Sequence, residues 1–80
     1  MKMTVSKYDL KQISKELQAT AQDDSYYGNA LYVALDIPQL DRHQKSVLRR
    51  YLRGSQTVSD RFVLQDIANL LIEIYNRKKD

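Results

Sequence analysis

The chain has 80 residues, of which 42% are hydrophobic and 29% are charged, and its net charge is +3. This length allows a single domain with one core, and the composition is typical of a folded domain rather than a disordered segment. The absence of cysteine excludes a disulfide framework, a thiolate zinc site and a cysteine nucleophile. Two glycines and one proline force few turns, which favours long helices.

The start of the sequence lacks the apolar segment of a signal peptide, and no apolar stretch approaches the roughly 20 residues that cross a bilayer. We therefore expect a cytoplasmic protein. Its charge is uneven along the chain. Residues 1–40 carry four basic and five acidic groups, whereas residues 41–80 carry nine basic and five acidic groups. An anionic partner is expected to meet the second half.

The first predicted helix covers residues 7–21. Ser6 and Asp9 fit a capping box at its start. An apolar residue recurs every three or four positions, which is the spacing of one helix face. The residues of this stripe are Leu10, Ile13, Leu17 and Ala21.

The second predicted helix covers residues 25–36, with residues 23–25 as its cap and Pro38 just beyond its end. Its apolar positions follow the pattern of a helix that faces a core. They are Tyr27, Ala30, Leu31, Ala34 and Leu35. The dipeptide Gly28-Asn29 could instead turn a β-hairpin. No other strand pair could extend that hairpin, and an isolated one is rarely stable.

The third predicted helix covers residues 41–53. It has Asp41 and Gln44 at its start, and Gly54 is placed to end it in a left-handed turn. One side is apolar, with Leu40, Val47, Leu48, Tyr51 and Leu52. The opposite side is basic, with Arg42, Lys45, Arg49 and Arg53, and with Arg50 at the flank.

The fourth predicted helix covers residues 58–77, and Thr57 and Asp60 form a second capping box. It carries two adjacent apolar stripes, which are Val63, Ile67, Leu70 and Ile74, and Leu64, Ala68, Leu71 and Tyr75. A face this wide predicts either the central helix of a bundle or a helix that gives one stripe to a partner. The second alternative includes a homodimer through this helix. Basic residues then complement the negative end of the helix, namely Arg77, Lys78 and Lys79.

Together these elements predict one all-α domain over residues 1–80, an antiparallel four-helix bundle with short loops. Catalytic residues are not evident. The only histidine, His43, lies between Arg42 and Gln44 without an acid or hydroxyl at a suggestive spacing, so a solvated surface position is expected. Glycine-rich phosphate loops and metal-ligand clusters are missing from the sequence. We therefore expect a binding protein without cofactor, metal or small-molecule substrate.

The basic side of residues 41–53 has two interpretations. It could contact phosphates or an acidic protein surface, or it could be an ordinary solvated helix face. A standard helix-turn-helix is disfavoured, because the following helix is too apolar to read base edges. The candidate partner-binding residues are Arg42, Lys45, Arg49, Arg50, Arg53, Arg77, Lys78 and Lys79.

Six tyrosines stand against one phenylalanine. Tyr27, Tyr51 and Tyr75 lie on apolar faces and are expected in the core. Tyr26 and Tyr32 lie off the stripe of their helix, which is compatible with an interface or with simple exposure.

Residues 40–74 resemble the last helices of the small immunity proteins that protect lactic acid bacteria against pediocin-like bacteriocins. The likeness lies in a basic helix with the pattern Val47-Leu48-x-x-Tyr51-Leu52, a loop containing Gly54, and a long apolar helix. Overall size, basic charge and a four-helix bundle agree with it.

This resemblance implies a cytosolic protein that engages a membrane sugar transporter captured by the bacteriocin and blocks its lethal opening. Two other functions remain open from the residues. One is a small nucleic-acid-binding regulator that uses the basic side of residues 41–53. The other is a phage or plasmid inhibitor of a host protein complex, which would use the same charges on an acidic protein surface.

Overall fold

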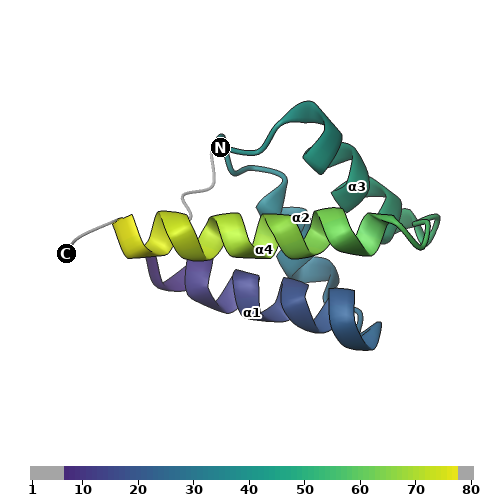
Figure 1. The fold of residues 1–80 in the computed structure, drawn as a ribbon, viewed down its shortest axis with the longest axis horizontal. Helices are drawn as coiled ribbons and strands as arrows, with labels where there is room; N and C mark the ends of the chain where they lie inside the picture. Colours follow the sequence, from purple (N-terminus) through teal and green to yellow (C-terminus); the bar gives the residue numbers. More distant parts are fainter. Residues whose placement is uncertain (1–6, 78–80) are drawn as a thin grey trace.

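The computed structural model of the protein describes residues 7–77, and the side chains from Asp9 onward. Within this range the chain forms four α-helices and no strand (Figure 1). They are α1 (Lys7–Asp23), α2 (Gly28–Ala34), α3 (Arg42–Arg53) and α4 (Asp60–Arg77). The predicted all-α bundle is confirmed, whereas the cap predicted at Ser6 lies outside the described residues. None of the four helices is both long enough and apolar enough to span a membrane.

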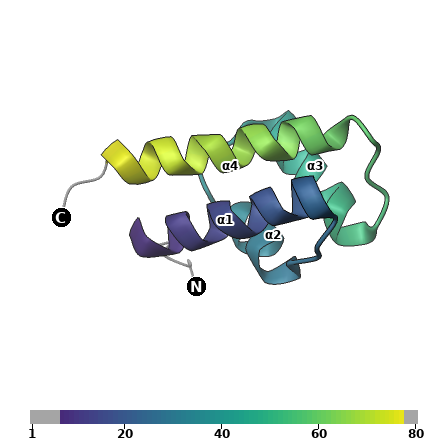
Figure 2. The same ribbon diagram turned by 60° about the horizontal axis from the view of Figure 1, so that its bottom comes forward.

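The four helices pack in a ring, in which each contacts two neighbours. The long helices α1 and α4 run antiparallel, side by side, while α2 contacts α1 and α3, and α3 contacts α4 at an incline (Figures 1 and 2). The prediction of a central helix for α4 is therefore wrong. Its wide apolar face is covered because one edge faces α1 and the other faces α3. Both predicted stripes pack into the core, with Leu64, Ile67, Ala68, Leu71 and Ile74 buried and Val63, Leu70 and Tyr75 partly buried.

The seam between α1 and α4 is tied by a polar contact that the apolar stripe of α1 does not reveal. Ser14 is fully buried, and its hydroxyl donates a hydrogen bond of 2.7 Å to the carbonyl oxygen of Ala68. Both side chains are small, so the two helix backbones can lie close together. The predicted stripe of α1 is buried on either side of Ser14, from Leu10 to Ala21.

The second helix is shorter than predicted at both ends. Asp24 has a φ of 58°, a left-handed conformation that aspartate tolerates better than most residues, and it ends α1 instead of capping α2. Gly28 is the first residue of α2, and the ring of the exposed Tyr26 lies against it, so that a Cβ there would stand 2.9 Å from the tyrosine oxygen. The hairpin alternative at Gly28-Asn29 is thereby overturned.

At its other end, α2 gives way to tight turns. After Ala34 the backbone bonds join residues three apart, as from the Ile37 amide to the Ala34 carbonyl at 3.1 Å. Pro38 has no amide hydrogen and disfavours a helical Ile37, so the helix cannot continue. Ile37 and Leu40 nevertheless stay buried and anchor this connection to the core.

Close packing at the seam predicts sensitivity to added volume. Ala68→Leu should lower the free energy of unfolding by about 1–3 kcal/mol, because the larger side chain must push α1 away from α4. Asn69→Leu introduces the same side chain one residue further on, at an exposed position, and is expected to change stability by less than about 0.5 kcal/mol. Urea unfolding followed by circular dichroism measures the free energy of unfolding of both variants. Equal losses of stability would show that close packing between α1 and α4 is not the reason for the effect of Ala68→Leu.

Candidate interaction surface

Helix α3, which carries the predicted basic side, is defined at both ends by its own sequence. The Asp41 side chain accepts from the Gln44 amide at 2.8 Å, and the Gln44 side chain accepts from the Asp41 amide at 2.9 Å. Gly54 ends the helix with a φ of 73°, and the Ser55 amide donates to the Arg50 carbonyl at 2.8 Å. The predicted capping box and left-handed end are confirmed. These caps satisfy backbone groups at both ends and so define where the helix begins and ends.

The register of α3 separates an apolar face from a basic one. Val47, Leu48 and Tyr51 are buried against the core. The basic residues on the opposite side are solvent-exposed or, for Lys45, partly exposed: Arg42, Lys45, Arg49 and Arg53. We call these four residues the α3 cations. None of them forms an ion pair within residues 7–77, so their charges are free to meet a partner.

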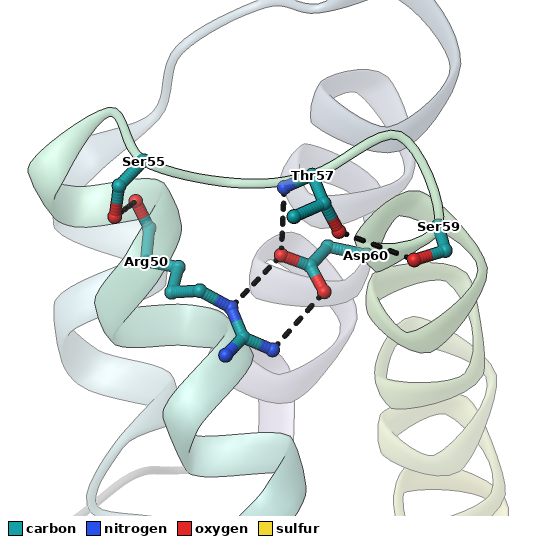
Figure 3. Close-up of polar contacts among 5 residues, drawn as sticks. All are labelled: Arg50, Ser55, Thr57, Ser59 and Asp60. Atoms are coloured by element: carbon teal, nitrogen blue, oxygen red, sulfur yellow. Dashed lines mark hydrogen bonds and ion pairs between the residues drawn. The ribbon is translucent and has the colours of Figure 1, made fainter.

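Arg50 differs from the α3 cations, since it belongs to the fold. Its guanidinium donates two hydrogen bonds to the carboxylate of Asp60, from Nε at 3.0 Å and from Nη2 at 3.1 Å (Figure 3). The Asp60 side chain is only 6% exposed, against 35% for Arg50. This bidentate pair joins the last turn of α3 to the first turn of α4. Arg50, although a candidate contact residue by sequence, is thus already engaged.

Asp60 also holds the loop between these helices. Its carboxylate accepts a hydrogen bond from the Thr57 amide at 2.9 Å (Figure 3). This is half of the predicted capping box, because the Thr57 hydroxyl is bonded to that of Ser59 at 3.1 Å. Residues 58–59 form a turn, so α4 begins two residues later than predicted.

The charge state of Asp60 follows from these contacts. Burial by itself would raise the pKa of its carboxyl, but the hydrogen bonds from Arg50 and Thr57 and the charge of Arg50 hold the pKa below its usual value. For the neighbouring Tyr51, burial raises the pKa of the hydroxyl, and the Asp60 charge raises it further. Asp60 is therefore an anion and Tyr51 a neutral phenol at neutral pH.

The other predicted site residues are dispersed. Arg77 pairs with Glu73 at 3.5 Å on α4, and Lys78 and Lys79 lie outside the described residues. His43 is exposed, as predicted. Within residues 7–77 there is no group of His, Asp or Glu side chains that could hold a metal ion.

The tyrosines divide in a way that the sequence predicts only in part. Tyr51 is buried as expected, and Tyr26 and Tyr32 are exposed. Tyr27 is 39% exposed, and its prediction as a core residue is wrong. It precedes the first turn of α2 with a non-helical φ of −124°, so its side chain leaves the stripe that helical spacing assigns to it. Tyr75 is partly buried, and the Lys11 ammonium lies 5.8 Å from its ring centre.

A surface depression of about 380 Å³ adjoins the C-terminal end of α3. Arg53 and Gly54 line it on one side, and Asp24 and Tyr26 line it on the other, with Tyr51 among the lining residues. Tyrosine and arginine are both enriched in protein interfaces. The depression therefore extends the surface of the α3 cations toward the loop between α1 and α2.

Sequence reasoning missed two exposed apolar side chains at the start of α4, Val58 at 81% and Phe62 at 67% exposure. Phe62 heads a row of helix positions that is otherwise polar, and this break in the pattern is the signal that could have revealed it. The row continues with Asp66, Asn69 and Glu73.

In comparisons with known proteins, the chain matches no protein-family model, no curated protein and no solved structure.

The Arg50–Asp60 pair predicts a defined pH dependence of stability. Because the pKa of folded Asp60 is lowered, its contribution is complete above the unfolded value and is lost as the pH falls through the folded value. Asp60→Asn should therefore lower the free energy of unfolding by about 2–3 kcal/mol at pH 7, and by progressively less below about pH 4.

The exposed Asp66 provides the matched control, since Asp66→Asn removes the same charge from the same helix. Urea titrations at several pH values between 2 and 7 compare the two variants with the original protein. A loss for Asp60→Asn that does not change with pH would show that its carboxylate charge contributes nothing.

Proposed function

We propose that this chain is a cytoplasmic, non-enzymatic binding protein that contacts an acidic protein surface through the α3 cations. The observation that carries the proposal is the unpaired state of these charges. Arg42, Arg49 and Arg53 are exposed without an ionic partner in the described chain, while the adjacent Arg50 is engaged inside the fold. A guanidinium is weakly hydrated and binds carboxylates in a planar fork, so it suits recognition of acidic groups.

The aromatic surroundings favour a protein partner over nucleic acid. Tyr26 stands beside Arg53 in the same depression, and Asp24 lines that depression as well. A carboxylate at this edge would repel phosphates, but it can pair with a basic side chain of a protein. Arginine and tyrosine are among the residues enriched in the hot spots of protein interfaces.

Within this class, the resemblance of residues 40–74 to pediocin-like immunity proteins supports a specific role. We propose that the protein protects its cell by engaging the cytosolic face of the membrane receptor that the bacteriocin has captured. The α3 cations would meet acidic groups on that face. An inhibitor of another host complex would use the same contact chemistry, and a challenge of living cells distinguishes the two.

One observation favours a nucleic-acid regulator as the second candidate. The α3 cations follow one another at steps of three, four and four residues, a row of roughly 16 Å along the helix. Such a row can track a phosphate backbone. Neutralising several phosphates makes affinity fall steeply with salt, and contact with an acidic protein patch does not follow this strict relation.

Fluorescence anisotropy of labelled duplex and single-stranded DNA, titrated at low and near-physiological salt, separates the candidates. We expect no binding at near-physiological salt and at most weak binding at low salt. Tight binding, with the logarithm of the binding constant falling by about 3 or more per tenfold increase in salt, would favour nucleic acid over a protein as the partner.

The protection assay tests the α3 cations directly. Cells that express the original chain should survive a pediocin-like bacteriocin, and the double variant Arg49→Glu, Arg53→Glu should lose this protection. Reversal of two of the four charges is expected to weaken binding by about 2 kcal/mol or more, or roughly thirtyfold. Both residues are exposed, so the bundle should stay folded, with a small decrease in melting temperature because Arg53→Glu removes a favourable charge from the last turn of α3.

Lys15→Glu is the control, because Lys15 is an exposed cation on α1, away from the α3 face. Cells that express this variant should survive the bacteriocin as well as cells that express the original chain. Survival of cells with the double variant at the original bacteriocin dose would show that the α3 cations are not the contact surface. Absence of protection by the original chain would instead remove the immunity role.

A further inference from the structure

The end of the bundle where α1 stops and α4 starts carries an apolar patch that the α3 cations do not include. Phe62 stands on the outer side of α4, and Val58 projects from the preceding turn. The C-terminal turns of α1 and the first turns of α4 lie next to each other at this end (Figures 1 and 2). A phenylalanine two-thirds exposed leaves much of its ring in water, and burial of that ring in an interface would be favourable.

Beside Phe62 the surface is hollow. A depression of about 360 Å³ lies between α1 and α4, and Ala21 and Gln22 of the first helix line it together with Arg61, Phe62 and Gln65 of the second. The small side chain of Ala21 leaves the space open. Gln22 and Gln65 bridge its edge through a hydrogen bond of 3.3 Å. The patch thus has an apolar projection and an adjoining hollow that is large enough to receive a side chain.

Arg61 lines this hollow, and its ionic partner Asp24 lines the neighbouring depression beside Arg53. The guanidinium of Arg61 lies 3.9 Å from the carboxylate of Asp24, and their side chains are 46% and 83% exposed. So long and exposed an ion pair contributes little to the folded chain. Its two charges can exchange partners at almost no cost when another surface of opposite pattern approaches.

We propose that this patch binds a second copy of the chain in a two-fold symmetric dimer. A two-fold interface requires one patch that is complementary to itself. This patch meets the requirement, because it holds a projection and a hollow, and also a cation and an anion. Phe62 of each copy enters the hollow of the other, and Arg61 of each copy pairs with Asp24 of the other. The α3 cations take no part, so dimerisation through Phe62 does not depend on their binding to a partner; Asp24 alone is shared, because it also lines the depression beside Arg53.

The first test is the concentration dependence of mass. A patch of a few residues is below the size of standard interfaces, so we expect a dissociation constant of roughly 10–500 µM. Sedimentation velocity between about 10 µM and 1 mM should show a shift from 9.4 kDa toward twice that mass. Phe62→Ser should weaken dimerisation at least tenfold. Tyr32→Ser, which changes an equally exposed aromatic on α2 outside the hollow, should leave it unchanged.

The second test exploits the symmetry of the charges. Arg61→Asp places two anions opposite each other in the dimer, and Asp24→Arg places two cations there, so each variant alone should remain monomeric. An equimolar mixture restores an opposite pair at both contacts and should form the heterodimer. Circular dichroism checks that both variants keep their helices, which is needed for Asp24 because of its positive φ.

Each alternative outcome overturns the proposal. An original chain that stays monomeric up to 1 mM would mean that the patch does not bind its own copy and is left for another protein. A dimer that survives Phe62→Ser would use a different face. A mixture of the charge variants that stays monomeric would show that Arg61 and Asp24 do not meet across a two-fold axis.

Discussion

The carboxylate of Asp60 accepts hydrogen bonds from two directions, and the relation between α3 and α4 depends on it. Arg50 reaches it from the last turn of α3, and the amide of Thr57 reaches it from the loop. Because the group is almost fully buried, removing either donor leaves an anion poorly solvated. Together with the buried face of α3 (Val47, Leu48 and Tyr51), the pair fixes the rotation of α3 about its own axis. That rotation in turn decides which basic side chains of α3 face solvent, so a buried contact determines the exposed surface.

The sequence contains clear signals for α1, α3 and α4, and their existence could be predicted because each segment has a capping pattern in its sequence and a regular apolar face. Asp41, Gln44 and Gly54 act locally, within a few residues of the helix ends that they define. Such local patterns can be recognised from the sequence without knowledge of the fold. Asp24 shows the limit of this approach. An aspartate before a helix predicts an N-cap of that helix. An aspartate that ends the previous helix in a left-handed conformation occupies the same place in the sequence, so the two cannot be told apart.

The candidate surface could be predicted only in part, because periodicity assigns each residue to a side of a helix but not to a partner. It placed Arg50 at the flank of the basic side, and nothing at a spacing of ten residues indicates a pair with Asp60. Ser14 was missed for a related reason. A buried hydroxyl is satisfied by the carbonyl of Ala68, 54 residues away in the chain, and such a contact exists only after α1 and α4 have packed. Phe62 is the reverse case, an apolar residue that no apolar stripe includes.

The exposed cations of α3 slightly lower the stability of their own helix. Lys45 and Arg49, and Arg49 and Arg53, are four residues apart, and like charges at this spacing destabilise a helix by about 0.2–0.5 kcal/mol per pair. A glutamate four residues before Arg49 would turn repulsion into attraction, yet α3 contains no acidic residue. Favourable interaction with the helix dipole reaches only the last turn, at Arg50 and Arg53. The helix thus carries a small cost in stability along its exposed side, and binding to an anionic surface is the interaction that would offset it.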